Sequence, residues 1–279
     1  MLATLLILGV GVAVASADPA TDSFRKGKEL LKQGELQPAL RSFGAAVKAD
    51  PKNSAYKVQY MQTRQAIVLQ SMLENEKDPQ KWQRMAAFLH AFYLKNGCLD
   101  LALEHDTAVH KKLGTAVSGM RLATTQMELK QNNAAAKTLA NLPPEVKKSD
   151  WAVKALLTVA LSRDGKEDDA KKIAATILLP KELKSGRALL AARVDAIQGE
   201  DDAALANLTK AFETTPPSRL PALKEEAKTC PELASLASTD AFAKALKTES
   251  KVPESSCSGG SSCATCPNRA KCQGKKSSK

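Results

Sequence analysis

The sequence predicts an all-α protein built from helical pairs, and three observations support this fold class. Only 11 of the 279 residues are aromatic (six Phe, three Tyr and two Trp), whereas strands favour aromatic and β-branched side chains. Alanine, the best helix former, is abundant along the chain. Alanine also recurs at a constant spacing, at positions 102, 136, 170 and 204. These observations exclude a strand-rich sandwich or barrel and predict helices packed through small side chains.

Residues 1–17 form an uncharged, apolar segment that ends in Ala15-Ser16-Ala17. Small residues at these spacings before Asp18 are typical of the cleavage site of a secretory signal peptide. We therefore expect residues 1–17 to be removed and the mature protein to be secreted or periplasmic, although an uncleaved anchor would have a similar composition. No other apolar run approaches this length, so we expect no membrane span after cleavage.

The clearest helical pair covers residues 23–53. Its first helix leads to Gly34, which favours a turn, and its second helix carries Ala39, Phe43 and Ala46 on one face. Pro51 ends the second helix. The segment therefore predicts two antiparallel helices joined at Gly34.

Four later positions repeat this arrangement. The alanine of the second helix and the turn residue five positions before it recur together, at Ala102 with Gly97, Ala136 with Gln131, Ala170 with Gly165, and Ala204 with Gly199. The interval from Ala39 to Ala102 is longer than one such period but shorter than two. A unit near residues 54–78 is therefore predicted to be degenerate and shortened, and one long helix over residues 54–76 would satisfy its pattern.

Residues 218–247 follow the last repeat. They contain short amphipathic segments at 221–229, 231–237 and 239–246. Because each helical repeat buries its apolar face only on a neighbour, a terminal repeat needs a cover. We expect these segments to form capping helices.

The repeat resembles the tetratricopeptide repeat, a helix-turn-helix unit whose period equals the spacing of these alanines. Gly27 matches the small residue at which the two helices touch, Ala39 the small residue of the second helix, and Pro51 the stop. The resemblance covers residues 22–217, in about five or six repeats, within a repeat domain at 18–217. It implies a right-handed superhelical solenoid whose concave groove, lined by first helices, binds a protein or peptide.

Composition and motifs do not indicate catalysis or nucleic-acid binding. The net charge is +11, but no aromatic residues alternate with the basic ones to stack on bases. The three histidines are His90, His105 and His110; the last two are five positions apart and cannot share a metal ion from one helical face. No nucleophile-elbow, phosphate-binding or dinucleotide-binding motif occurs. We therefore expect a protein that is not an enzyme.

The groove positions of the predicted first helices carry a basic bias. They include Arg84, Lys95, Arg121, Thr125, Arg163 and Arg193. Glu128 is the one acidic exception among them. Such a surface would favour an acidic peptide or a free C-terminal carboxylate, although basic residues on an exposed face can also serve only to solvate it.

Residues 248–279 form a basic segment that is rich in Ser and Gly and is predicted to be a flexible tail. It contains four of the six cysteines, in the pattern C-x5-C-x2-C-P-x4-C, at Cys257, Cys263, Cys266 and Cys272. Four thiolates at such spacings can hold zinc or an iron-sulfur cluster. The C-x2-C-P-N-x3-C part is similar to the cluster site of the scaffold ATPases of iron-sulfur assembly, although no ATPase domain follows.

Two other interpretations of the tail remain open. Disulfides would suit an exported protein, and a redox-active or lipid-modified C-x2-C is the third interpretation. If the tail is the functional site, the protein handles metal or redox chemistry and the repeats only dock it. The other two cysteines, Cys98 and Cys230, are separated by three or more repeats and are predicted not to pair with each other.

Overall fold

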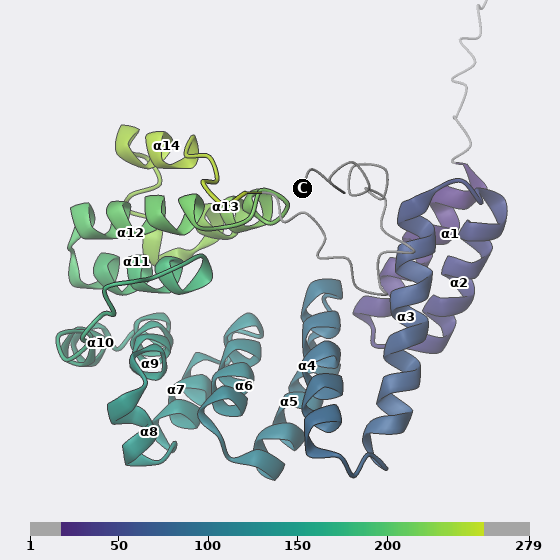
Figure 1. Cartoon of the computed structure of the whole chain (residues 1–279), viewed down its shortest axis with the longest axis horizontal. Coiled ribbons are helices and arrows are strands. Elements are labelled where there is room, and N and C mark those ends of the chain that lie inside the picture. Colours follow the sequence, from purple (N-terminus) through teal and green to yellow (C-terminus); the bar gives the residue numbers. More distant parts are fainter. Residues whose placement is uncertain (1–17, 254–279) are drawn as a thin grey trace, which may run out of the picture. The chain divides into compact units, whose positions relative to one another are not determined.

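The computed structural model describes residues 18–253, without the side chains of residues 147–149, and in this range it contains fourteen α-helices, one short 3₁₀ helix and no strand (Figure 1). The all-α prediction is therefore confirmed for the described residues. The chain divides into two compact units between Lys112 and Leu113, and each is treated by itself below.

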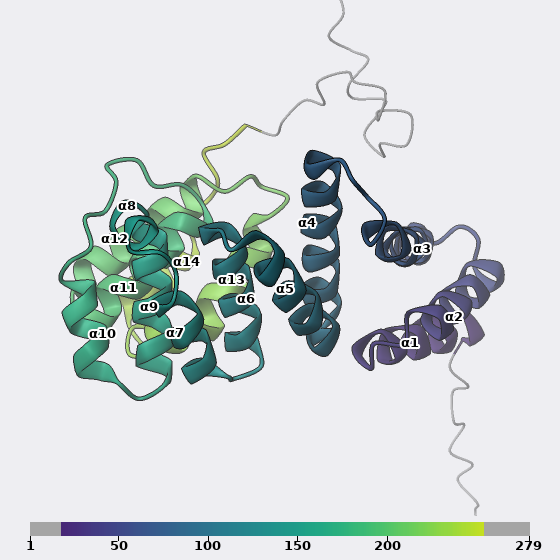
Figure 2. The ribbon, with the colours of Figure 1, turned by 90° about the horizontal axis from the view of Figure 1, so that it is seen from below.

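Unit 1 contains five helices. They are α1 (Pro19–Lys32), α2 (Leu36–Ala49), α3 (Ser54–Leu73), α4 (Pro79–Asn96) and α5 (Leu99–Leu113). Helices α1 and α2 pack against each other, and α3 contacts both α2 and α4 (Figures 1 and 2). Side-chain hydrogen bonds join α4 to α5.

Unit 2 contains the remaining helices. They are α6 (Ala116–Glu128), α7 (Asn132–Ala140), α8 (Pro144–Ser149), α9 (Trp151–Arg163), α10 (Glu167–Ala174), α11 (Gly186–Gln198), α12 (Asp201–Glu213), α13 (Leu220–Thr229), the 3₁₀ helix η1 (Pro231–Leu233) and α14 (Asp240–Leu246). The first helices of the pairs contact one another in sequence, α6 with α9 and α9 with α11. Consecutive helices thus pack as expected for a helical repeat.

Five turns with the same backbone geometry join the helical pairs. In the first, Gly34 N–H donates to Leu31 O and the next residue, Glu35, donates to Leu30 O. The same two bonds recur at the turns of α4–α5, α6–α7, α9–α10 and α11–α12. The central residue has a positive φ in each, at Gly34 (79°), Gly97 (70°), Lys130 (59°), Gly165 (76°) and Gly199 (82°). This left-handed C-cap satisfies the last carbonyls of a helix and favours glycine.

At the third turn, the turn residue and the contact alanine both lie one position earlier than the repeat spacing predicts. The sequence predicts Gln131 at the turn and Ala136 in the second helix, but Lys130 holds the left-handed position and Ala135 is the residue whose N–H begins α7 by donating to Gln131 O. The step between the turn residues Gly97 and Lys130 is therefore one position shorter than the regular spacing of the alanines. Ala136 is still buried, at 6% exposed, whereas Ala135 is 0% exposed.

The predicted small residues lie at helix contacts. Ala39, Ala102, Ala170 and Ala204 are all 0% exposed, and Ala136 is 6% exposed. Gly27 faces the Phe43 ring so closely that a Cβ added there would lie 2.5 Å from a ring carbon. The prediction that small residues mark the closest helix approaches is confirmed.

Helix α3 differs from the other first helices because no second helix follows it. Residues 74–78 lead directly to α4, so the shortened second unit is one long helix, as its pattern allowed. The side of α3 away from its buried residues carries a row of exposed apolar side chains. They are Val58 (50% exposed), Met61 (64%), Val68 (46%) and Met72 (49%). Figure 2 looks nearly along the axis of this helix.

The segments after the last repeat form α13, η1 and α14. Helices α13 and α14 pack on α12, and η1 packs on α11 and α9. Phe242 of α14 is 2% exposed and belongs to the same core as Leu208 and Phe212. The predicted signal peptide and nearly all of the predicted tail lie outside the described residues. Within residues 18–253, no helix has both the length and the apolar character that crossing a membrane requires.

Candidate functional site

The six predicted groove residues do not form one cluster. Arg84 and Lys95 lie in unit 1, on α4, and both are exposed; Lys95 Nζ donates to Gln62 Oε1 at 3.4 Å. The other four lie in unit 2. Of these, the structure brings together two, Arg163 at the end of α9 and Arg193 on α11.

Arg163 and Arg193 hold a carboxylate of the same chain. Arg163 Nε donates to Glu232 Oε1 at 2.6 Å, and Arg193 Nε donates to Glu232 Oε2 at 2.9 Å. The Glu232 side chain comes from η1 and is 1% exposed, whereas the arginines are 19% and 12% exposed. One carboxylate therefore bridges two adjacent first helices through charge-assisted hydrogen bonds.

The ionisation of this cluster follows from its geometry. Burial alone would raise the pKa of the Glu232 carboxyl, but Arg193 and Arg163 outweigh burial and hold that pKa below its usual value. Burial would likewise lower the pKa of Arg163, and its bond to Glu232 reverses this and raises it. The Glu232 carboxylate and the Arg163 guanidinium are therefore both charged at neutral pH.

The two arginines line a groove of about 740 Å³ in unit 2. Its lining comes from α6, the turn after it, α7, α9, α11, α13 and the start of η1, and includes Thr124, Glu128, Lys130, Arg163, Arg193, Glu226 and Cys230. Cationic and anionic side chains are equal in number at this site: Arg163, Arg193 and Lys130 against Glu128, Glu226 and Glu232. The basic bias predicted from sequence is therefore balanced by acidic groups, two of which follow the repeats.

Two predicted groove residues are absent from this lining. Thr125 is 0% exposed, so its assignment to a binding surface was wrong, and Arg121 is half-buried elsewhere on α6. The shift of the third turn by one position explains the error. Arg193 precedes the contact residue Ala204 by eleven positions, and the residue that precedes Ala135 by eleven is Thr124, which does line the groove.

Arg193 retains hydrogen-bonding capacity toward the groove. Its Nε binds Glu232, while neither of its terminal Nη groups donates to any group in the part of the chain that the structure describes. A guanidinium that is 12% exposed and faces a cavity is a ready donor for a second carboxylate.

The histidines have structural partners. His90 Nδ1 lies 2.8 Å from Asp106 Oδ2, an oxygen of a carboxylate that is 1% exposed. His105 Nε2 donates to Ala86 O at 2.9 Å, and its ring meets that of Tyr93 edge-on. His90 and His105 thus join α4 to α5.

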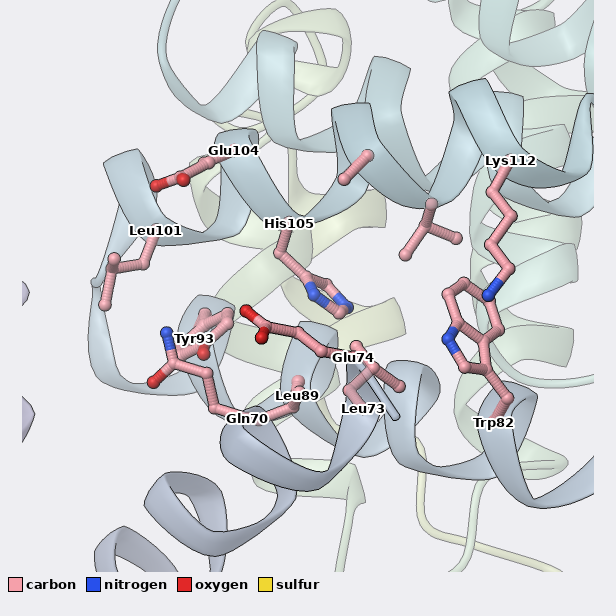
Figure 3. A pocket seen from close by; sticks show the side chains of 12 residues that line it. Gln70, Leu73, Glu74, Trp82, Leu89, Tyr93, Leu101, Glu104, His105 and Lys112 are labelled. Atoms are coloured by element: carbon pink, nitrogen blue, oxygen red, sulfur yellow. The ribbon is translucent and has the colours of Figure 1, made fainter. Parts of the chain in front are cut away.

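A second cavity, not foreseen from the sequence, lies within unit 1. It has a volume of about 320 Å³ and is lined by α3, α4 and α5 (Figure 3). Figure 3 shows the His105 ring pointing into it from α5 and Glu74 reaching into it from the end of α3. Lys112 Nζ lies 4.1 Å from the centroid of the Trp82 ring at one side.

The two cysteines outside the predicted tail, Cys98 and Cys230, are free thiols, so the prediction that they do not pair with each other is confirmed. Cys98 and Cys230 are both buried. Burial raises the pKa of Cys98 to about 11 and also raises that of Cys230, which keeps both protonated. Among the described residues, no group of three or more His, Cys, Asp or Glu side chains is arranged to hold a metal ion. Cys257, Cys263, Cys266 and Cys272 lie outside the described residues.

Comparison with known proteins does not assign a family. No protein-family model matches the chain, and no curated protein matches it in sequence.

Proposed function

We propose that the protein is an exported, non-enzymatic scaffold of the tetratricopeptide type that binds a protein or peptide partner. Its helical pairs would form a right-handed superhelical solenoid with a concave side made by first helices. The five turns of identical backbone geometry support the repeat, and the contacts of α6 with α9 and α9 with α11 support a row of first helices. Export is inferred from residues 1–17.

The bound segment is proposed to carry a carboxylate, either an acidic side chain or a free C-terminus. The bridging of Arg163 and Arg193 by the Glu232 carboxylate carries this proposal, because the groove wall already holds a group of that chemistry. The terminal Nη groups of Arg193 would bind the incoming carboxylate beside Glu232. Because acidic groups balance the basic ones here, the preference would come from hydrogen-bond geometry more than from net charge.

The test compares fluorescent peptides that differ only at their C-terminus. Two random-sequence pools, one ending in a free carboxylate and one in an amide, are titrated with the full chain, and binding is followed by fluorescence anisotropy. We expect the carboxylate pool to bind about tenfold more tightly, as one charge-assisted hydrogen-bonded pair contributes on the order of 1.5–3 kcal/mol. Arg193→Gln should remove this preference.

Arg187→Gln is the matched control, since Arg187 lies on the same helix but is exposed and away from the groove. It should leave the preference intact. Circular dichroism of each variant checks that the helices remain. Equal binding of both pools to the unmodified chain would refute a carboxylate site, and binding of neither pool would count against the scaffold itself.

A further inference from the structure

The cavity of unit 1 has apolar and aromatic walls. Six of its lining residues are large and apolar or aromatic: Leu73 of α3, Trp82, Leu89 and Tyr93 of α4, and Leu101 and Val109 of α5. Its volume of about 320 Å³ is at the lower end of that of small-ligand sites and suits one extended side chain or a small molecule. The walls therefore select an apolar group of modest size.

The chain places an ammonium group against the aromatic wall. Lys112 Nζ lies 4.1 Å from the centroid of the Trp82 ring, well inside the range of a cation–π interaction, and Trp82 is itself 7% exposed. Lys112 extends toward this ring from the end of α5 in Figure 3. The indole face thus already recognises a primary ammonium.

The acidic groups of the cavity favour the same charge. Glu74 and Glu104 line it from α3 and α5, and both residues are exposed to solvent. Figure 3 shows the Glu74 carboxylate extending into the cavity toward His105 and Tyr93. Burial raises the pKa of Tyr93 to about 12, so its phenol adds no negative charge at neutral pH. The lining of the cavity thus carries two carboxylates and one ammonium, that of Lys112.

We propose that this cavity binds a primary ammonium carried on an apolar arm, such as a lysine side chain of a partner or a free alkylamine, and that the ligand takes the place of Lys112 on Trp82. The ammonium would lie on the Trp82 face and the arm between Leu73, Leu89 and Val109, and the two carboxylates of the lining would favour a cation over an anion in the cavity. The site belongs to unit 1 alone, so it does not depend on the carboxylate site proposed for unit 2.

Trp82 provides the signal for the test, because the chain has only two tryptophans. In the Trp151→Phe full chain, Trp82 fluorescence is followed during titration with n-butylammonium, with butanoate, and with the blocked tripeptides Gly-Lys-Gly and Gly-norleucine-Gly. We expect saturable changes with butylammonium and the lysine peptide, and none with butanoate or the norleucine peptide. Tighter binding of the peptide would identify a protein side chain as the ligand, and tighter binding of butylammonium a free amine.

Variants separate ligand recognition from general effects. Lys112→Met should tighten butylammonium binding several-fold by removing the competing ammonium, and Glu74→Gln should weaken it about twofold to threefold by removing one carboxylate from the lining. Lys111→Met, at the exposed neighbouring residue, is the control and should change nothing. Butanoate or the norleucine peptide binding as well as the cations would overturn the proposal. So would unchanged or weaker amine binding by Lys112→Met.

Discussion

Within each helical pair of both units, the two helices contact each other through residues that are equivalent in the repeat but differ in type. In each pair, one contact residue lies in the first helix, seven positions before the left-handed turn residue. The other lies in the second helix, sixteen positions after the first contact residue. In unit 1 these residues are Gly27 with Phe43 and His90 with Asp106. In unit 2 they are Ala123 with Leu139, Thr158 with Ala174, and Ala192 with Leu208, all at most 1% exposed.

The difference shows that the contact is set jointly by both residues. Where the first helix offers glycine, the second offers a phenylalanine ring; where it offers alanine, the second offers leucine. Close-packed interiors tolerate such exchanges when the summed volume is kept. The pair His90–Asp106 fills the same place with a hydrogen bond instead. Unit 1 thus builds with glycine, an aromatic ring and a polar pair a contact that unit 2 builds from alanine, leucine and threonine.

The two tryptophans allow each unit to be followed separately. Trp82 lies in unit 1 and Trp151 in unit 2, so Trp151→Phe and Trp82→Phe backgrounds report on one unit each during urea unfolding. The indole N–H of Trp151 is buried and has no hydrogen-bond partner among the described residues, so its replacement by phenylalanine removes no hydrogen bond. The predictions below use these backgrounds.

The largest effect is expected from the polar pair. His90→Ala leaves the Asp106 carboxylate, 1% exposed, without the ring nitrogen that now contacts both of its oxygens. We expect the free energy of unfolding reported by Trp82 to fall by about 1.5–3 kcal/mol, the range for a hydrogen bond to a charged group. The double variant His90→Ala/Asp106→Leu recreates the alanine–leucine contact of unit 2 and should recover most of this loss. A double variant as unstable as the single one would show that the contacts are not interchangeable.

The aromatic pair should respond next. Gly27→Ala forces a methyl group against the Phe43 ring and is expected to cost about 1–3 kcal/mol, again reported by Trp82. Adding Phe43→Leu should offset part of that loss, because the pair then matches Ala192–Leu208. Gly44→Ala is the control: its added methyl would lie 3.5 Å from Tyr60, an ordinary contact, and should stabilise α2 by about 0.5–1 kcal/mol.

A smaller gain is expected at Thr158. Its hydroxyl is fully buried and has no hydrogen-bond partner among the described residues. Thr158→Val replaces the hydroxyl with a methyl group of similar size and should raise the stability reported by Trp151 by about 1 kcal/mol. Thr209→Val, at a hydroxyl that donates to Leu205 O, removes a hydrogen bond and should give no such gain. Equal gains at both sites would refute the explanation.

The smallest effect concerns the one turn among these five that lacks glycine. Lys130 adopts φ 59°, a conformation that costs a residue with a Cβ about 1 kcal/mol. Lys130→Gly should therefore stabilise unit 2 by up to about that amount, whereas Gly165→Ala, at the equivalent position of the next turn, should destabilise it similarly. Thermal unfolding of both variants, followed by Trp151, measures the two effects. A loss at Lys130→Gly would mean that the lysine side chain contributes more than its backbone strain costs.

The sequence permits prediction of the turns because their chemistry is local. A left-handed C-cap favours glycine, and the alanine five positions later is needed for close helix approach, so both are visible as a period. The contacts between positions sixteen apart are not visible in this way. Gly27–Phe43, His90–Asp106 and Thr158–Ala174 occupy equivalent positions in the repeat but do not share a residue type. The third turn is misplaced by one position in the sequence-based frame because Lys130 gives no glycine signal.

The candidate sites were predictable only where they follow the repeat. The repeat frame places Arg163 and Arg193 on one face, and they do meet. Their shared partner Glu232 was not foreseen, because it comes from a segment beyond the last repeat that has no periodicity. The unit 1 cavity was missed for a similar reason: Trp82 and Lys112 are thirty positions apart and meet only through the packing of α4 on α5.

The unpaired helix α3 has a chemical consequence, because two of its exposed apolar side chains are thioethers. Met61 and Met72 are 64% and 49% exposed, whereas Met85 and Met127 are 8% and 5% exposed. Mild peroxide should therefore convert the α3 methionines to sulfoxides first, since accessible sulfur reacts fastest. An apolar row on one helix would become polar while the rest of the fold is untouched. The polarity of the exposed side of α3 would then depend on how far its methionines have been oxidised, which peptide mass spectrometry measures.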